Sequence, residues 1–220
     1  CRTDDNRKAL DCGDWLCHEN CWNDSAKAAM ESVYEHLNTD YGLMVCAPPY
    51  EKEKLEVIRA VLFNPGQKEN GGIFCHNNPW VIIGETKLGR GDKALDYWKR
   101  IAPAFREEHS ELHRMEPYVY SQMIAGKDAF KPGEAKNSWL SGTAAWNYYT
   151  ITQSILGIKP QYEGIEISPC IPKSWKGYKI ERKFRGALYR ITIDNSAGVN
   201  RGVKELTVNG EKITGNFIPV

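Results

Sequence analysis

The 220-residue chain has almost no excess of charge of either sign, and this narrows the classes of partner. Its formal net charge is +1, from 29 lysines and arginines against 28 aspartates and glutamates. No basic tract suited to a phosphodiester backbone occurs, so we expect no nucleic-acid partner. With 41% hydrophobic and 26% charged residues, the composition is typical of a globular protein of one or two domains.

Long hydrophobic runs are also missing. No apolar run approaches the roughly 18 residues that a membrane span needs, so we expect no membrane association. No positively charged segment leads into an apolar stretch as in a signal peptide. Internal repeats and low-complexity segments are absent as well. The cysteine count is seven, and an odd count favours free thiols in a reducing cytoplasm, which is the predicted location.

Residues 1–22 are not assigned to any domain, because they show neither a helical nor a strand period. Cys12, Cys17 and Cys21 lie in this segment, with His18 among them. Their spacings do not match the usual zinc-binding pairs, so we predict no metal site, although His18 leaves that alternative open. We also expect no cofactor.

Hydrophobic periodicity divides the rest of the chain into two parts. Residues 23–158 show helical stripes, and residues 159–220 show the alternation typical of strands. An Asn209-Gly210 pair predicts a hairpin turn in the second part. The expected helices span 23–37, 79–88, 92–101 (capped by Asp92) and 141–157, and the expected strands span 165–167, 178–184, 187–193 and 203–208.

The stretch from Lys68 to Trp80 combines an acid, two glycines, a histidine and two amides just ahead of a predicted buried helix. Such a segment is a poor core element and a good lining for a polar pocket. The alternative is a loop that feeds the helix, with Asn77 or Asn78 as its cap and a partly buried His76.

Ser141-Gly142-Thr143 forms the start of another predicted helix. Hydroxyl groups at this position can cap free backbone amides. A helix start built from small residues is also a natural seat for an anion.

From about residue 38 onward, the chain contains seven short pieces that occur together in one known family. They are 41–42 with 47–49, 68–76, 88–92, 116–118, 139–143, 155–158 and 169–172. In these pieces and in their order, the chain resembles glycoside hydrolase family 94, the inverting disaccharide phosphorylases of the cellobiose and N,N'-diacetylchitobiose type. The resemblance implies a mainly α fold with a β tail: the last part of an (α/α)6 barrel followed by a small antiparallel β domain.

The resemblance also implies a reaction. Inorganic phosphate attacks the anomeric carbon of a β-linked disaccharide, and inversion gives an α-sugar-1-phosphate and a free sugar. Phosphate is a substrate, and one carboxylic acid must protonate the leaving oxygen.

Particular positions match the family's binding residues. The phosphate contacts fall on His76, Ser141, Gly142 and Thr143. An imidazolium, a hydroxyl and helix-start amides all favour a dianion.

The sugar contacts of the family fall on other positions. Trp80 and Trp139 are candidates for shaping the sugar pocket, but for Trp80 and Trp146 we favour packing in the core. The positions that match direct sugar contacts are Glu69, Gln122 and Tyr118.

The family's general acid has no counterpart that we can assign. It lies in an Asp-Trp-Asn-Asp motif, of which 13–15 and 22–24 each show half. We therefore expect this chain alone to be inactive, and to form oligomers or associate with the missing remainder of the enzyme. Two alternatives stay open: a non-catalytic carbohydrate- or phosphate-binding fragment, and an (α/α)6 glycoside hydrolase, which would need two carboxylates around the bond.

Overall fold

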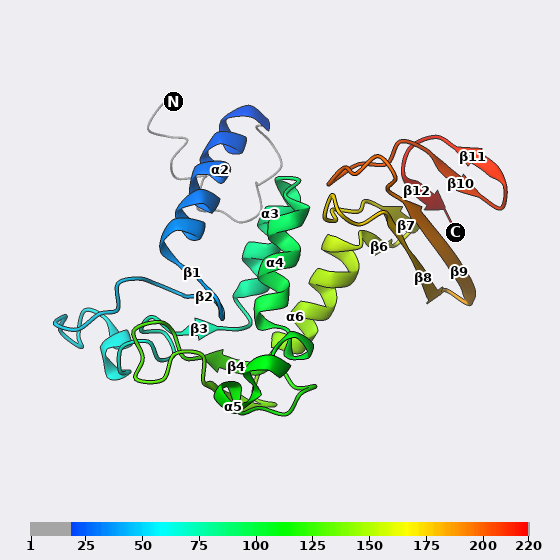
Figure 1. Ribbon diagram of the computed structural model, residues 1–220. Coiled ribbons are helices and arrows are strands. Elements are labelled where there is room, and N and C mark those ends of the chain that lie inside the picture. Colours follow the sequence, from blue (N-terminus) through cyan, green and yellow to red (C-terminus); the bar gives the residue numbers. More distant parts are fainter. Residues whose placement is uncertain (1–18, 220) are drawn as a thin grey trace.

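A computed structural model describes residues 19–219, with side chains from residue 24 onward. Its helical part is a row of helices, with α6 as the outermost member next to the β unit (Figure 1). A π-helical turn, η4 (Thr150–Ile155), continues α6. The helices of the row are α2 (Glu19–His36), α3 (Asn78–Lys87), α4 (Gly91–Ile101) and α6 (Thr143–Tyr149).

The hairpin of α3 and α4 forms the centre of this row. Gly89, with a φ of 74°, ends α3 in the left-handed conformation that glycine adopts readily. The helix α4 turns its apolar side inward, as its sequence predicts, and Tyr97 is fully buried. The buried residues of this core are Leu43, Ile82, Ala94, Tyr97, Ile155 and Ile171.

The expected caps of these two helices are wrong. Neither Asn77, at the N-cap of α3, nor Arg90, at the N-cap of α4, makes a side-chain cap bond. Asn78 instead clamps a distant strand, accepting from Leu43 N at 2.8 Å and donating to Leu43 O at 3.0 Å. Asp92 lies inside the first turn of α4 and bonds to the β unit. In both cases a tertiary partner takes the side chain that a local cap would have used.

A small antiparallel sheet lies beneath the helices, and the sequence analysis did not anticipate it. It consists of β3 (Ile73–Phe74), β4 (Ser121–Ile124) and β5 (Ala135–Ser138), with β4 in the middle. Its apolar residues join a second core, which includes Met44, Ile73, Cys75, Ile101, Ile124 and Ala135.

Short elements connect these larger ones. They cover only two to four residues each, and two of them, β1 and β2, pair antiparallel. The short elements are β1 (Asn38–Thr39), β2 (Gly42–Leu43), η1 (Arg59–Leu62), η2 (Pro103–Phe105), η3 (Glu107–His109) and α5 (Ser110–His113).

The β unit follows η4 and contains only antiparallel pairs among its named strands. A three-stranded sheet has the order β12-β7-β6, and two hairpins, β8–β9 and β10–β11, complete the unit. Asn209 and Gly210 form the predicted turn between β10 and β11, both with positive φ. The strands are β6 (Ile158–Gln161), β7 (Gly164–Ile167), β8 (Gly177–Phe184), β9 (Ala187–Asp194), β10 (Leu206–Val208), β11 (Glu211–Ile213) and β12 (Phe217–Pro219).

The prediction of a helical part followed by a small antiparallel β unit is confirmed. The switch from helix to strand falls between the end of η4 at Ile155 and the start of β6 at Ile158. The division into separate domains at this point stays a prediction, and so does closure of the helices into a barrel.

The two parts meet at the start of α4. Asp92 accepts hydrogen bonds from the backbone N of Lys173 at 3.2 Å and from Asn200 Nδ2 at 2.8 Å. Arg201 donates to the carbonyl oxygen of Lys87 at 2.7 Å. Gly91 touches Ile171 so closely that a Cβ at this position would lie 2.3 Å from its carbonyl oxygen. The junction is therefore a fitted contact with several polar anchors.

Some expectations concern residues outside this description. Cys12, Cys17, His18 and Asp14 lie before residue 19, and the side chain of Cys21 is not described. Among the side chains that the structure describes, from residue 24 to residue 219, no group of three potential metal-binding residues comes together. None of the helices in this range is both long enough and apolar enough to cross a membrane.

Candidate functional site

The segment Cys75-His76 lies where the small sheet, α3 and the start of α6 meet. The backbone N of Cys75 donates to the carbonyl oxygen of Gln122 at 2.9 Å. The Cys75 thiol lies 3.3 Å from the hydroxyl of Ser121. Thr143 in turn donates its hydroxyl to the carbonyl oxygen of Ser121 at 3.2 Å. Ser121 therefore connects the residue before His76 with the first residue of α6.

The start of α6 is held by its own hydroxyl groups. Ser141 Oγ accepts from the backbone N of Thr143 at 3.0 Å and also bonds to the Thr143 hydroxyl. Thr143 is fully buried, whereas Ser141 is half-buried and Gly142 is exposed. In this arrangement Thr143 positions the turn, and Ser141 and Gly142 are the members that solvent can reach.

His76 belongs to a row of aromatic rings. Its ring makes edge contacts with Phe74, at 4.8 Å between centroids, and with Trp80, at 5.8 Å. Trp80 makes a further edge contact with Trp146 of α6, at 5.8 Å. The structure thus brings His76 and the 141–143 turn to one wall, joined by hydrogen bonds on one side and rings on the other. Phosphate binding there stays a prediction.

Gln122 has a side chain with a fixed orientation. Its Oε1 accepts from Lys68 Nζ at 3.2 Å and from Asn137 Nδ2 at 2.9 Å. Its Nε2 donates to the carbonyl oxygen of Leu140 at 3.1 Å. One N–H of the amide is left for another acceptor, so Gln122 is arranged as a hydrogen-bond donor.

Three residues around Gln122 have a left-handed backbone. The φ angles are 45° for Lys68, 57° for Asn137 and 67° for Trp139. Non-glycine residues adopt this conformation at a cost, and such residues cluster at sites where function requires a particular geometry. This concentration of strain supports a binding role for the Gln122 wall.

The other predicted sugar contacts lie at the exposed rim. Glu69 is exposed and follows Lys68 directly. Tyr118, which is 75% exposed, makes an edge contact with Trp139 at 6.4 Å between ring centroids. Trp139 donates its indole N–H to Glu116 at 3.2 Å. Glu69 and Gln122 are linked through Lys68, while Tyr118 and Trp139 form a separate aromatic pair.

The expectation that Trp80 and Trp146 pack in the core is wrong. Trp80 is 50% exposed and Trp146 is 39% exposed. Trp80 lies on α3 and Trp146 on α6, and no described residue covers either ring fully.

Sequence reasoning missed Lys68, Asn137 and Ser121. Lys68 lies in the stretch from Lys68 to Trp80, but the match to the family's sugar contacts falls on its neighbour Glu69. The contacts of Asn137 and Ser121 come from strand pairing in the unexpected sheet, where Ser121 lies opposite Ser138. Hydrophobic periodicity does not reveal side-chain contacts between paired strands, so these two residues could not be predicted from the sequence.

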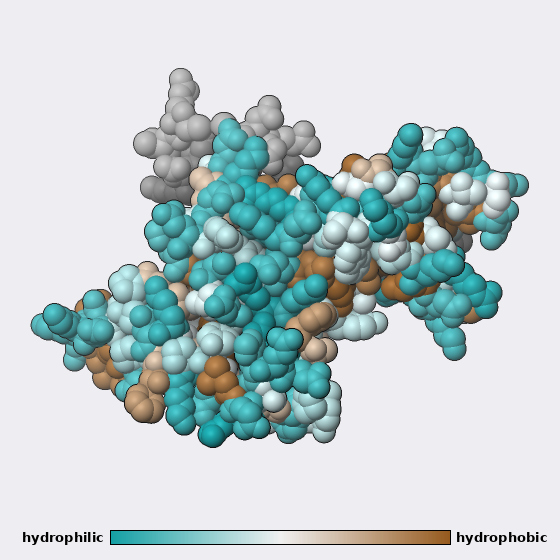
Figure 2. Space-filling view, in the orientation of Figure 1, coloured by the Kyte–Doolittle hydropathy of each residue, from teal (hydrophilic) through white to brown (hydrophobic). Residues whose placement is uncertain are grey.

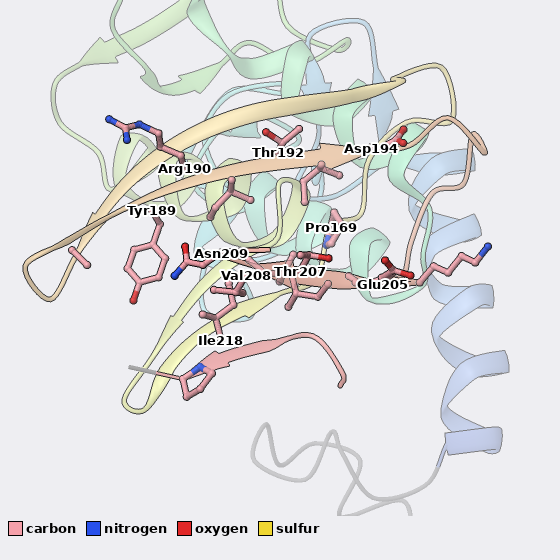
Figure 3. Close-up of a pocket in the computed structure, with 18 of the residues that line it drawn as sticks. Pro169, Tyr189, Arg190, Thr192, Asp194, Glu205, Thr207, Val208, Asn209 and Ile218 are labelled. Atoms are coloured by element: carbon pink, nitrogen blue, oxygen red, sulfur yellow. The ribbon is translucent and has the colours of Figure 1, made fainter. Parts of the chain in front are cut away.

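A groove of about 780 Å³ lies elsewhere, on the β unit (Figure 3). It runs beside β9, β10 and β12 and is lined by polar residues such as Thr207 and Asn209 as well as by apolar residues such as Ile167, Val208 and Ile218. Several of these residues also belong to the core of the β unit, which the two hairpins cover only in part. None of the predicted site residues lines this groove.

Comparison with known protein families shows which family this chain belongs to. A family model described as the glycosyl hydrolase 94 superfamily, catalytic domain, matches residues 17–157. The chain belongs to the glycosyl hydrolase 94 superfamily. A second model, the C-terminal domain of glycosyl hydrolase family 65, matches residues 158–214, which form most of the β unit. The resemblance noted from the sequence is therefore confirmed.

Several known phosphorylases are similar to this chain. An N,N'-diacetylchitobiose phosphorylase of Vibrio proteolyticus is 40% identical over 191 residues, 87% of this chain and 24% of that protein. A solabiose phosphorylase of Paenibacillus borealis is 34% identical over 89% of this chain and 25% of its own length. A cellobionic acid phosphorylase of Neurospora crassa is 30% identical over 84% and 23%. The chain thus spans about a quarter of the length of these relatives.

Proposed function

We propose that this chain is part of a carbohydrate phosphorylase. The protein would cleave a β-linked disaccharide, such as N,N'-diacetylchitobiose or cellobiose, with inorganic phosphate. Inversion would give an α-sugar-1-phosphate and a free sugar. The observation that carries the proposal is membership of the superfamily, with several similar relatives that are disaccharide phosphorylases. The proposal includes closure of the row of helices, with helices from elsewhere in the protein, into an (α/α)6 barrel.

Phosphate is assigned to the wall formed by His76, Ser141 and Gly142. A protonated imidazole attracts a dianion, and a hydroxyl can donate to a phosphate oxygen. Thr143 supports this site from its buried position, because it bonds to both Ser141 and the β4 backbone. No resident cofactor is needed in this scheme, since phosphate is itself the nucleophile.

The sugar is assigned to the adjoining Gln122 wall. Gln122 offers one N–H to a sugar hydroxyl, and Glu69 offers a carboxylate that accepts from one. Tyr118 and Trp139 give the rim aromatic faces against which a sugar ring can pack. The general acid that protonates the leaving oxygen is not assigned to any residue of this chain.

The test is a chimera in which this chain replaces the matched segment of the Vibrio proteolyticus phosphorylase. We expect phosphate-dependent release of a sugar-1-phosphate from N,N'-diacetylchitobiose. His76→Ala should raise the KM for phosphate by about tenfold or more, the loss expected for one charge-assisted hydrogen bond, with a smaller effect on the KM for sugar. The matched control is His36→Ala, because His36 is an exposed histidine at the end of α2.

Three outcomes would contradict the proposal. Release of free sugar without phosphate would indicate a hydrolase. Sugar binding without turnover would indicate a non-catalytic binding module. An equal loss of phosphate affinity in His36→Ala and His76→Ala would remove His76 from the phosphate site.

A further inference from the structure

Two strands of the β unit have an edge that no other described strand pairs with. Among the described residues, β9 pairs only with β8, and β10 pairs only with β11. Every residue of β9 lines the groove shown in Figure 3, whereas no residue of β8 does. Since neighbouring residues of a strand point to opposite faces, the groove follows the free edge of β9. All three residues of β10 line it as well.

A free strand edge offers a ligand both kinds of hydrogen-bonding group. Backbone N–H and C=O groups occur along it, and on this side they have no strand to bond to. The groove has a volume of about 780 Å³, within the range of about 300–1,000 Å³ that is typical of small-molecule sites. Gly202 also lines it, and a Cβ there would meet no atom within 4 Å. The space beside the two edges is therefore open to a ligand.

The charges around the groove cancel. It is lined by two basic and two acidic side chains, which are Arg190, Lys204, Asp194 and Glu205. Arg190 donates to Glu181 at 2.9 Å, and Glu205 forms an ion pair with Lys212 at 2.7 Å. A lining without an excess of either sign favours a neutral ligand over an ion.

The rest of the lining combines polar groups with apolar surface. Thr207 and Asn209 are exposed and can bond to hydroxyl groups, while Ile167 and Ile218 are buried and apolar. Figure 3 shows the Tyr189 ring and the Asn209 amide at the same end of the groove. Figure 2 shows hydrophobic residues of the β unit scattered between hydrophilic ones. A sugar needs such a mixture, because its ring has hydroxyl groups around the rim and C–H groups on the faces.

We infer that this groove binds a neutral, β-linked oligosaccharide at a site separate from the Gln122 wall. Sugar hydroxyls, which both donate and accept, match the N–H and C=O groups of the two strand edges. A groove that follows strands also fits the extended chain that β-1,4-linked sugars form. None of the residues assigned to phosphate or to the disaccharide lines the groove, so the inference is independent of the proposed reaction.

A strand from a second copy of the chain is the competing occupant. It could pair with the same edges, but charged side chains on an edge strand oppose such pairing. Arg190 and Asp194 on β9 provide such charges, and so do Lys204 and Glu205 just before β10. The sugar is therefore the occupant that the lining favours.

The test is isothermal titration calorimetry of the 220-residue chain with cellotetraose and with tetra-N-acetylchitotetraose. We expect at least one of them to bind, and Asn209→Gly to weaken that binding by about fivefold or more, the loss of one or two hydrogen bonds. Glycine keeps the left-handed backbone of Asn209, whose φ is 52°, so the turn should persist. Tyr189→Leu removes the ring and its hydroxyl, keeps an apolar side chain, and should weaken binding similarly.

The matched control is Arg185→Gly. Arg185 has the equivalent left-handed position in the turn between β8 and β9, with a φ of 47°, and does not line the groove. We expect its substitution to leave the affinity unchanged. Hydrogen exchange gives a second readout: the bound sugar should slow the exchange of backbone amides in β9 and β10 but not in the sheet of β3, β4 and β5.

The inference is wrong if neither sugar binds, or if Asn209→Gly and Arg185→Gly weaken binding equally. Loss of binding in Gln122→Ala, with none in Asn209→Gly or Tyr189→Leu, would place the sugar only at the Gln122 wall; this would overturn the inference and keep the proposed function. A dimer whose β9 and β10 amides are protected without sugar would identify a second copy as the occupant and would also overturn it.

Discussion

At the scale of single residues, the cysteines of the described part have different surroundings. Cys46, Cys75 and Cys170 are free thiols. Burial raises the pKa of Cys75 to about 12, although its contact with Ser121 lowers it in part. Burial likewise raises the pKa of Cys170 to about 11. Because the thiolate is the reactive form, both thiols should be inert in the folded protein.

The first prediction concerns this inertness. At pH 8, iodoacetamide should alkylate Cys75 of the folded chain about a thousandfold more slowly than in urea, because its thiolate population is smaller by about that factor and the side chain is buried. The half-buried Cys46 is the control. Peptide mass spectrometry measures both rates, and fast alkylation of Cys75 before unfolding would contradict the buried position.

The second prediction concerns Asn137 as a positioning residue. Asn137→Asp cannot donate to Gln122 Oε1, so the amide of Gln122 is no longer fixed as a donor. In the chimera we expect the KM for disaccharide to rise by about tenfold, with kcat and the KM for phosphate changed much less. The control is Lys136→Ala on the same strand, and a fall in kcat with KM unchanged would contradict the assigned role.

The third prediction concerns Glu85, a fully buried glutamate of α3. Its two carboxylate oxygens have no hydrogen-bond partner among the described residues, and Oε2 lies 3.6 Å from Arg90 Nη1. Burial raises its pKa, and Arg90, Lys93 and Glu31 act on it as nearby charges. The folded state therefore holds the proton more tightly than the unfolded state does. Stability from this group is present below the unfolded pKa, near 4.3, and is lost as pH rises through the raised folded pKa.

Glu85→Gln removes that pH dependence. We expect equal free energies of unfolding for the two proteins near pH 4 and about 1 kcal/mol more for the variant at pH 8. Arg90 keeps its contact with Glu31, 2.8 Å away, in either case. Urea unfolding at several pH values is the measurement, with the exposed Glu35→Gln as control. If the variant is less stable than the parent at pH 8, the buried, ionised Glu85 carboxylate does not destabilise the folded state and the prediction is wrong.

At the scale of elements, the start of α4 matters more than its sequence suggests. The Gly89-Arg90-Gly91-Asp92 segment reads as a turn between two helices, which it is. It also contacts the β unit, because Asp92 accepts hydrogen bonds from Lys173 and Asn200. The carbonyl oxygen of Lys87, just before the segment, accepts another from Arg201. Gly91 is needed there because of this close approach and not because of a left-handed backbone.

The fourth prediction follows from that contact. Gly91→Ala should lower the free energy of unfolding by about 2 kcal/mol, because the added Cβ would lie 2.3 Å from a backbone oxygen that cannot easily move. Gly142→Ala is the control, since the nearest atom to its Cβ is 3.8 Å away. Chemical denaturation measures the free energy of unfolding of both variants. Equal values would show that the backbone around Ile171 shifts easily to make room for the added Cβ.

At the scale of the whole molecule, the described part contains walls of a site without all the chemistry of the proposed reaction. His76, Gln122 and the 141–143 turn lie along one side, and the partly exposed rings of Trp80 and Trp146 continue from it. Closure into the proposed barrel would complete that side and would bury these rings.

The fifth prediction is that the 220-residue chain alone has little or no phosphorolysis activity. Delivery of a proton to the leaving oxygen contributes about 10²- to 10⁴-fold, and no acid of this chain is assigned to it. The measurement is sugar-1-phosphate released from N,N'-diacetylchitobiose or cellobiose with phosphate, with the chimera as the positive control. Robust turnover by a monomer would refute the prediction and would make Asp14 and Asp24 the first positions to mutate.

From the sequence alone, the main helices, the switch from helix to strand and the family could be predicted. Periodicity and turn residues are local, so α3, α4 and the Asn209-Gly210 turn were predictable from a few neighbours. The motifs that match the family are also short and contiguous, so they can be recognised in the sequence.

Features that depend on partners far apart in the chain became visible only in the folded structure. In the sheet of β3, β4 and β5, strand β3 pairs with β4, which lies about fifty residues further along the chain. Strand β5 then pairs with β4 from a nearer position, with Ser138 opposite Ser121, and the sheet creates the contacts of Ser121 and Asn137. The side chains of Asn78 and Asp92 left their expected caps because distant backbone groups compete for them. The exposure of Trp80 and Trp146 was equally invisible in the sequence, because an apolar helix face reads the same whether or not its partner is present.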